Sequence, residues 1–328
     1  MERLSQTLAQ GDSALVACER SAEGVLSAIG ITYLAHAKPD QVRLAAGASM
    51  SPRIGETIVD VPEDVTLAER VMRGLERRVA NRCPCARGGR CGGGCTESCV
   101  NMIHYAALSD SEEMPQAVHE YVRLCFDQGN QVRNNIADPR VRAVDDLASY
   151  VVDECERTRQ FVRFRQLNNG LYYSLFRPKA NTLPATAGYF RARMGTTPFC
   201  MLDPNHGIGV FSNERIVVTK LDPELVEQMR AQGERISEDE RYIQQMWRTF
   251  YDQVSLTGRD SSMRGYDLRA SWMPKRFWRD MPDMAPRVDP ATLTTPLRYR
   301  GKTQENNNGV LSHAEGIREL SQPASTSH

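Results

Sequence analysis

The sequence predicts an α+β fold: a helical first half with a short strand pair, then a small antiparallel sheet flanked by helices. Three observations support this prediction. Apolar residues recur every three or four positions over much of the first 164 residues, the spacing then changes to two, and the end of the chain is polar and repetitive. We therefore expect one α+β domain over residues 1–285 and a disordered polar tail over 286–328.

Two short strands and four helices are predicted in the first half. The apolar runs at 13–19 and 56–61 are typical of strands. Ser21 is the expected N-cap of the first helix, and Asp138 with Pro139 starts the last one. The predicted helices cover residues 21–37, 67–80, 116–128 and 141–164.

The second half begins with a hairpin signal. Two alternating runs, "FVRFRQL" from residue 161 and "LYYSLF" from residue 171, flank the turn "NNG". A helix is predicted over 183–194, and two or three strands follow between 198 and 221. A final amphipathic helix is expected over 237–256, with Ser237 and Glu240 as its capping box.

Five cysteines and five glycines lie within residues 81–99, in an insertion at about 81–100. The residues between the thiols are too polar to form a core, so a bound Zn²⁺ or iron–sulfur cluster would have to order them. The expected ligands are Cys85, Cys91, Cys95 and Cys99, with Cys83 and His104 as further candidates. Because the spacing differs from paired Cys-x2-Cys sites, an unliganded flexible insertion is the alternative.

The location expected for the chain is the cytoplasm. No run approaches the 18 apolar residues of a membrane span, and the N-terminus lacks the pattern of a signal peptide, so we expect no membrane partner. Nine cysteines without a secretion signal argue against a disulfide framework.

Charge is balanced overall, with 41 basic and 41 acidic residues, but it is unevenly distributed. Residues 157–193 contain eight basic residues and no acidic one, whereas 110–156 contain eleven acidic residues against four arginines. This segregation indicates a face that meets a polyanion such as DNA. The alternative is a solvated arginine face that pairs with the acidic segment.

The candidate nucleic-acid-binding residues come from this stretch and from a second one near residue 275. On a strand, Arg163 and Arg165 would share one face, next to Tyr172 or Tyr173. In "WMPKRFWRDMP" at 272–282, we expect Phe277 and Trp278 to close the core, and the basic side chains of Lys275 and Arg276 to remain at the surface. The full set is Arg163, Arg165, Arg177, Lys179, Asn181, Lys275 and Arg276.

Catalytic patterns are scarce in this sequence. It has no phosphate-binding loop with Lys-Ser/Thr, no Gly-x-Ser-x-Gly and no His-Glu-x-x-His. Asp203 and His206, three residues apart at a strand end, are candidates for an acid–base pair. The alternative is an aspartate that caps the Asp-Pro turn.

Several of these motifs together resemble a bacterial family of DNA-metabolism or DNA-repair proteins whose defining domain has no assigned function. The resemblance covers about residues 12–285. It is carried by the Arg-Phe-Arg-x-Leu run at 163–167, the Asn-x-Leu-Pro turn at 181–184 and the Met-Pro-Lys-Arg-aromatic-Trp run at 273–278.

The resemblance implies an accessory role in DNA repair or modification. Members of this family typically occur beside a radical-SAM protein related to spore photoproduct lyase, and some are fused to a domain similar to uracil-DNA glycosylase. Many relatives have Asp-His where this chain has Lys179-Ala180, which weakens any case for acid–base chemistry at that turn. The cysteine-rich insertion has no counterpart in the resemblance.

The leading hypothesis is a nucleic-acid-binding protein of DNA repair or modification that works with a radical-SAM partner. One alternative is an enzyme acting on a modified or damaged base, through Asp203, His206 or a cysteine-bound metal. Another is a protein-interaction adaptor that does not contact DNA.

Overall fold

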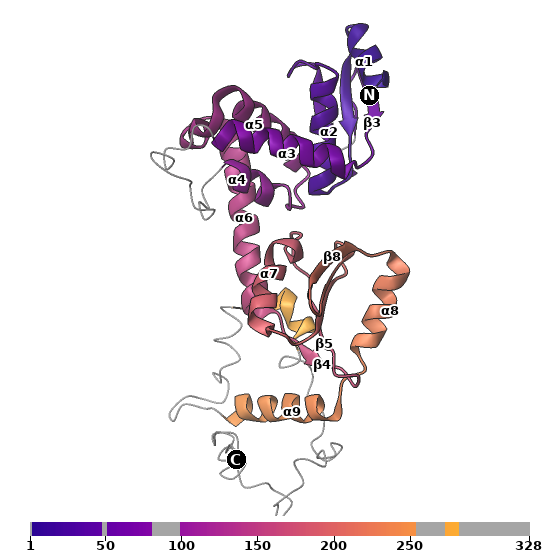
Figure 1. Ribbon diagram of the computed structural model, residues 1–328, viewed down its shortest axis with the longest axis vertical. Helices are drawn as coiled ribbons and strands as arrows, with labels where there is room; N and C mark the ends of the chain where they lie inside the picture. Colours follow the sequence, from indigo (N-terminus) through magenta and orange to yellow (C-terminus); the bar gives the residue numbers. More distant parts are fainter. Residues whose placement is uncertain (1, 48–50, 81–98, 254–272, 282–328) are drawn as a thin grey trace, which may run out of the picture.

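The computed structural model describes residues 2–47, 51–80, 99–253 and 273–281. These residues form an N-terminal region and a C-terminal region joined by one long helix, α6, which runs vertically in Figure 1. The predicted α+β class is confirmed, because both regions combine helices with a sheet. Most of the cysteine-rich insertion and the whole predicted tail lie outside the described residues.

A three-stranded parallel sheet lies in the N-terminal region. Its central strand β1 (Ser13–Ala17) pairs with β2 (Val42–Ala45) on one side and β3 (Glu56–Asp60) on the other. The first and third strands confirm the prediction, but β2 adds a strand to the predicted pair. Its four residues, Val-Arg-Leu-Ala, are too few to show a clear alternation, and β2 forms a strand because β1 offers it hydrogen-bonding partners.

The helices of this region are α1 (Glu2–Ala9), α2 (Ala22–Leu34), α3 (Val65–Ala80), α4 (Cys99–Ala106) and α5 (Met114–Gln128). Helices α1, α2 and α5 contact this sheet, and α3 and α4 pack on α5. Ser21 is confirmed as a helix N-cap, at the start of α2, since its hydroxyl accepts a hydrogen bond from the Gly24 N–H at 2.9 Å.

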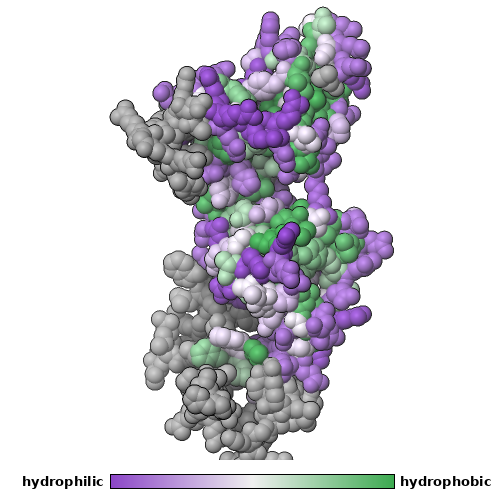
Figure 2. Space-filling view, viewed as in Figure 1, coloured by the Kyte–Doolittle hydropathy of each residue, from purple (hydrophilic) through white to green (hydrophobic). Residues whose placement is uncertain are grey.

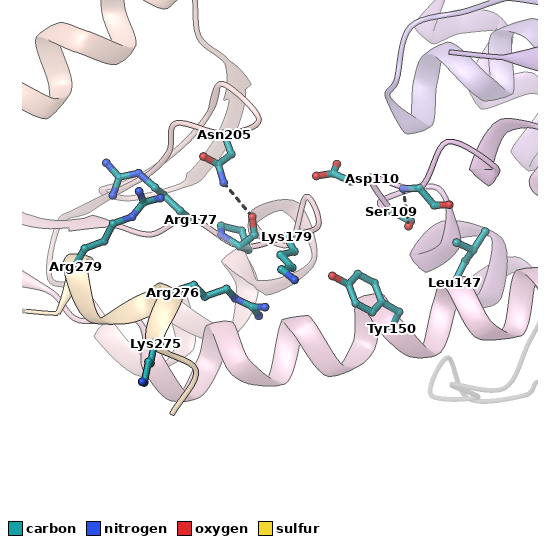
Figure 3. Close-up of a pocket in the computed structure, with 12 residues that line it drawn as sticks. Ser109, Asp110, Leu147, Tyr150, Arg177, Lys179, Asn205, Lys275, Arg276 and Arg279 are labelled. Atoms are coloured by element: carbon teal, nitrogen blue, oxygen red, sulfur yellow. Dashed lines mark hydrogen bonds between the residues drawn. The ribbon is translucent and has the colours of Figure 1, made fainter. Parts of the chain in front are cut away.

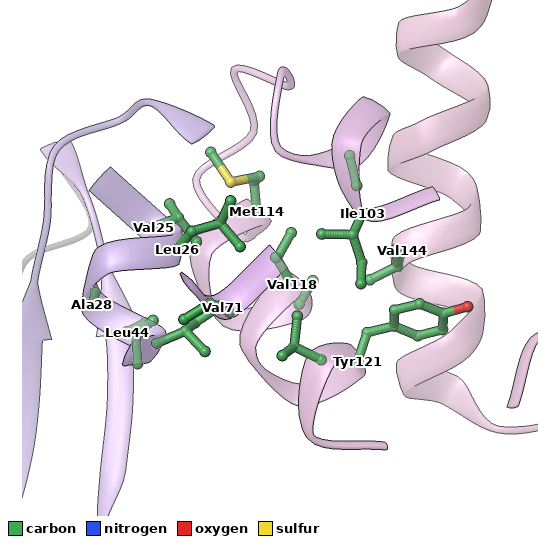
Figure 4. Close-up of a cluster of buried hydrophobic side chains, with 14 of the residues drawn as sticks. Val25, Leu26, Ala28, Leu44, Val71, Ile103, Met114, Val118, Tyr121 and Val144 are labelled. Atoms are coloured by element: carbon green, nitrogen blue, oxygen red, sulfur yellow. The ribbon is translucent and has the colours of Figure 1, made fainter. Parts of the chain in front are cut away.

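One hydrophobic core unites the sheet and helices of this region. Figure 4 shows side chains from α2, β2, α3, α4, α5 and α6 converging on it. Val118 and Tyr121 of α5 are completely buried, and Val144 brings the first half of α6 into the same core. The N-terminal half of α6 is therefore an integral part of the N-terminal region.

Helix α6 (Pro139–Phe161) connects the two regions. It begins as predicted, with Pro139 in its first turn and the Asp138 carboxylate accepting the Arg140 N–H at 2.9 Å. Further along, Val151 and Cys155 pack with Leu108 and Ala180. The space-filling view shows the molecule narrowing between the two regions (Figure 2), so the continuous backbone of α6 is a major part of the link.

The C-terminal region contains a five-stranded sheet in the order β4-β5-β6-β7-β8. The hairpin around "NNG" is confirmed, and so are the three strands that follow the next helix. One pair, β5–β6, is parallel, which corrects the predicted antiparallel sheet. The reason is α7 (Leu183–Met194), which crosses over between them and allows the same strand direction. The strands are β4 (Arg165–Gln166), β5 (Tyr172–Leu175), β6 (Phe199–Asp203), β7 (Ile208–Ser212) and β8 (Ile216–Lys220).

Both faces of the central strand β6 are covered. On β6, Phe199 and Met201 face a cluster that includes α7 and the 3₁₀ helix η5 (Lys275–Asp280). Cys200 and Leu202 face the opposite cluster, which includes residues of α8 (Pro223–Gly233). This arrangement explains why all five residues of β6 are buried.

Helix α9 (Glu238–Gln253) is attached to the sheet through its first turn. The Ser237 hydroxyl accepts the Glu240 N–H at 3.1 Å, as the predicted capping box requires. The Glu240 carboxylate instead accepts the Gln166 N–H of β4 at 3.1 Å. None of the helices in the described ranges has the length and apolar character needed to cross a bilayer.

The packing of η5 confirms that Phe277 closes the second core. Its ring is completely buried and stacks on Phe176 with ring centroids 4.6 Å apart. Trp278 is half-buried, and its indole N–H donates to the Met273 carbonyl at 3.2 Å. Consequently Lys275 and Arg279, on the same short helix, remain exposed.

We predict that Phe277→Ala lowers the free energy of unfolding by about 3–5 kcal/mol, because it leaves a cavity beside Phe176. Lys275→Ala, two residues away and exposed, is the control and is expected to change it by less than about 0.5 kcal/mol. Urea unfolding of both variants measures the effect. Equal stability of the two variants would show that η5 does not close this core.

Candidate functional site

A pocket of 810 Å³ lies where the two regions meet α6. Its lining comes from five places in the chain: the loop after α4, the middle of α6, the loop between β5 and α7, the turn between β6 and β7, and η5 (Figure 3). The lining residues are Ser109, Asp110, Ser111, Leu147, Tyr150, Arg177, Pro178, Lys179, Asn205, Lys275, Arg276 and Arg279. The pocket therefore depends on tertiary structure rather than on one motif.

The pocket brings together four of the seven predicted nucleic-acid-binding residues: Arg177, Lys179, Lys275 and Arg276. Arg279, which was not among the predicted residues, is a fifth basic residue of the lining, and these five side chains form what we call the basic wall. The place of Arg279 in the basic run "KRFWRD" was the available signal, since Lys275, Arg276 and Arg279 of η5 all belong to the lining. Among the described residues, the side-chain ammonium groups of Lys179 and Lys275 are exposed and have no hydrogen-bonding partner.

Glu154, a completely buried carboxylate of α6, holds part of this wall in place. Arg276 Nη2 lies 2.7 Å from Glu154 Oε1 and 2.5 Å from Oε2. The Lys179 N–H donates to Oε1 at 2.8 Å, and Arg157 Nη1 donates to Oε2 at 3.2 Å. One carboxylate thus fixes η5 and the β5–α7 loop against α6, a role that its place in an acidic segment did not reveal.

The Asp280 carboxylate holds the Arg177 side chain in place in the basic wall, because the two form an ion pair. Burial raises the pKa of the Asp280 carboxyl, while the charges of Arg177, Arg279 and Arg165 oppose this shift. Arg165 is not one of the residues that line the pocket. Its guanidinium carbon lies 5.7 Å from the centre of the Tyr173 ring and its Nη1 is 3.8 Å from Glu234 Oε1.

Arg163 does not share a strand face with Arg165, which corrects that prediction. Helix α6 continues to Phe161 and β4 begins only at Arg165, so Arg163 lies in the connection between them. Its Nη1 donates to the Gln160 carbonyl at 2.9 Å and to the Val162 carbonyl at 3.2 Å. Arg163 therefore satisfies carbonyls at the C-terminal end of α6.

Asn181 lies at the junction of the two regions rather than in the lining of the pocket. Its N–H donates to the Leu108 carbonyl at 3.0 Å. The buried Oδ1 of its side chain has no hydrogen-bond partner among the described residues. The backbone of Asn181 thus connects the start of α7 to the loop that carries Asp110.

The predicted pair Asp203 and His206 is in contact, beside the pocket. His206 Nδ1 lies 2.5 Å from Asp203 Oδ2. Asp203 Oδ1 also accepts the N–H groups of Asn205 at 3.0 Å and His206 at 3.4 Å, so the carboxylate caps the turn as well. A third partner comes from the other region: His206 Nε2 lies 3.0 Å from Oδ1 of Asp110, which lines the pocket.

These contacts determine the charge of His206. Burial lowers its pKa, but the hydrogen bonds with Asp110 and Asp203 and their negative charges outweigh burial and raise it to about 9. Burial raises the pKa of the Asp203 carboxyl against the effect of His206. At neutral pH His206 is an imidazolium whose two N–H groups both face carboxylates, which ties the N-terminal and C-terminal regions together.

The predicted metal ligands are only partly within the described residues. Cys83, Cys85, Cys91 and Cys95 lie outside them. Cys99, the first residue of α4, is completely buried beside Cys125 and Tyr121, whereas His104 lies five positions later on that helix and is exposed. Within the described ranges, no group of three or more His, Cys, Asp or Glu residues could hold a metal ion. Zinc or iron–sulfur binding stays a prediction.

Comparison with known proteins gives a family match over residues 112–283, to a domain of unknown function, DUF4130. This span contains the basic wall and His206 but not Asp110. No curated protein matches the chain. A solved structure described as a DHH domain of a member of the s1p family of ribosomal proteins is 10% identical, with a TM-score of 0.27, covering 71% of this chain and 88% of that one.

We predict that His206 stabilises the protein in a pH-dependent way. Its folded pKa of about 9 exceeds the unfolded value of about 6.5, so the stabilisation is complete below about pH 6.5 and is lost as pH rises through 9. The stability difference between wild type and His206→Gln should shrink by up to about 3 kcal/mol over this range. Urea unfolding at a series of pH values measures it.

His104→Gln on α4 is the control: burial lowers the pKa of His104, so the stability difference between wild type and this variant should not shrink as the pH rises. A difference that also fails to shrink for His206→Gln would contradict the assigned contacts with Asp110 and Asp203.

We also predict that Glu154→Gln lowers the free energy of unfolding by about 1.5–3 kcal/mol, because charge-assisted hydrogen bonds to Arg276 and Arg157 are lost. Glu156→Gln removes a more exposed carboxylate from the same helix and should cost at most about 1 kcal/mol. Chemical denaturation compares the two, and a smaller effect at Glu154 than at Glu156 would refute the role of the buried carboxylate.

Proposed function

The chain belongs to the DUF4130 family of domains of unknown function, and we propose that it is an accessory protein of DNA repair or DNA modification that binds nucleic acid in the basic pocket and works with a radical-SAM partner. The observation that supports nucleic-acid binding is the convergence of two basic segments about 100 positions apart on one pocket wall. Five of the twelve lining residues are basic and one is acidic. Such a wall matches the charge of a phosphate backbone.

The five cations differ in what they can offer a phosphate. Arg177 and Arg276 are paired with Asp280 and Glu154, so their charges are largely neutralised and their guanidinium groups are held in place. Lys179 and Lys275 are exposed, and Arg279 has only a loose contact, 3.9 Å from Asp280. These three side chains supply the positive charge that remains for a ligand.

The role in DNA repair and the radical-SAM partner rest on the resemblance of the sequence motifs. Co-expression with the radical-SAM protein, followed by a pull-down after nuclease treatment, tests the partnership. A complex that is lost on nuclease treatment would indicate that the two proteins meet only on DNA. Metal and absorbance analysis after anaerobic purification tests zinc or iron–sulfur binding by the cysteine-rich insertion.

A second candidate function is an enzyme acting on a modified or damaged base. The observation that favours it is the cluster of Asp203, His206 and Asp110 beside the pocket, since Asp110 belongs to both. For His206 to act on a substrate, Nε2 must separate from Asp110, because both ring nitrogens are occupied. Product formation from damaged oligonucleotides that is lost in His206→Gln would support this function over simple binding.

We predict that Lys179→Ala combined with Lys275→Ala weakens single-stranded DNA binding and lowers the slope of log Kd against log salt by about 1.4, as expected for the loss of two phosphate contacts. The control, Lys38→Ala with Arg70→Ala, removes the same charge at exposed sites outside the pocket. Fluorescence anisotropy over a salt series measures both.

Equal effects of the two double variants would contradict binding in the pocket. Arg163→Ala with Arg165→Ala forms a third arm. We expect it to weaken binding through the charge of Arg165, and an unchanged affinity would remove both arginines from the interface.

A further inference from the structure

We infer that the pocket binds an unpaired nucleotide of a single strand, with its base stacked on Tyr150 and its phosphates among Lys179, Lys275 and Arg279. This inference rests on the proposed function and specifies which nucleic-acid structure the pocket accepts. It is carried by the separation of the pocket into a basic wall and an aromatic wall.

Figure 3 shows this separation. The basic side chains come from the β5–α7 loop and η5 on one side. On the other side, Tyr150 and Leu147 project from α6, with Ser109 and Asp110 above them. A nucleotide has the same two ends, an anionic phosphate and a flat base that stacks on apolar or aromatic side chains.

Tyr150 has the properties of a stacking residue. Its side chain is 40% exposed although its ring belongs to the pocket lining. It lies three positions after Leu147 on the same face of α6, which gives the base a broader apolar surface. Burial and the charge of Glu154 raise the pKa of its hydroxyl, so the phenol is neutral in the physiological range.

The volume of the pocket and the polar groups in its lining fit a base that has left the stack. The pocket volume of 810 Å³ is within the usual range of about 300–1,000 Å³ for small-molecule sites, so it holds a nucleotide but not a duplex. A base inside a duplex would have to leave the stack to reach Tyr150. Asp110, Ser111 and Asn205 place carboxylate, hydroxyl and amide groups in the lining, where base edges can hydrogen-bond.

The charges favour a strand over a free nucleotide. Lys179 comes from the β5–α7 loop and Lys275 and Arg279 come from η5, and Figure 3 shows Lys275 pointing away from the other two, so one phosphate group does not face all three charges. A free nucleoside monophosphate has the same chemistry with only one phosphate group. Competition with thymidine monophosphate therefore distinguishes the two sources.

The experiment compares two single strands of equal charge and length: an oligothymidylate of about six nucleotides, and an abasic oligomer with the same number of phosphates. The full-length protein and Tyr150→Ala, Tyr150→Phe and Tyr189→Ala are titrated with each. Tyr189 is the matched control, because it is also a tyrosine with 40% exposure but lies on α7 outside the pocket lining.

For wild type, Tyr150→Phe and Tyr189→Ala, we expect the oligothymidylate to bind about 5–150-fold more tightly than the abasic oligomer, since a stacked base contributes about 1–3 kcal/mol. Tyr150→Ala should lose most of this preference while binding the abasic oligomer like wild type. Thymidine monophosphate and a duplex should compete only weakly with the single strand.

The outcomes separate the inference from the proposed function. If Tyr150→Ala keeps the preference for bases while Lys179→Ala with Lys275→Ala weakens both oligomers, the pocket binds only the backbone and the inference is wrong. Full competition by thymidine monophosphate, or equal affinity for a duplex, also overturns it. If wild type binds neither oligomer, the proposed nucleic-acid function itself fails.

Discussion

The buried carboxylate of Glu154 is the contact on which the candidate site depends. It lies inside α6 and accepts hydrogen bonds from the Arg276 side chain and the Lys179 backbone, which belong to segments about 100 residues apart. A buried charge is costly unless it is paired. Displacing either segment would remove a hydrogen bond from the buried Glu154 carboxylate and destabilise the fold. The basic wall is therefore assembled by an acidic residue, and its position follows from the position of α6.

Helix α6 links the stability of the protein to the shape of the pocket. Its first half belongs to the N-terminal core through Val141 and Val144, and its second half carries Glu154 toward the C-terminal region. Tyr150 lies between these parts and faces the pocket. Because helical spacing fixes the distance between Tyr150 and Glu154, the proposed stacking surface and the basic wall are held in register by one rigid element.

The arrangement of charges assigns different roles to residues of the same type. Arg177 and Arg276 are paired with buried carboxylates and shape the wall, whereas Lys179 and Lys275 are exposed and available to a ligand. His206 is charged and is bound by carboxylates at both nitrogens, so in this conformation it joins the two regions. In this conformation neither ring nitrogen of His206 is available to accept a proton from a substrate, which is why we propose binding before catalysis.

The sequence alone determined the features that depend on neighbours a few residues apart. The Ser21 cap, the start of α6 at Pro139, helix α7 and the contact of Asp203 with His206 were all predicted, because capping, proline geometry and short turns act locally. Most of the basic residues of the pocket were also predicted, because they lie in basic stretches of the sequence. Only the tertiary structure decided the direction of β5 and β6 and which charges are buried. In a sequence, a carboxylate that is paired inside the protein looks the same as one in water, until folding brings its partner from a distant segment.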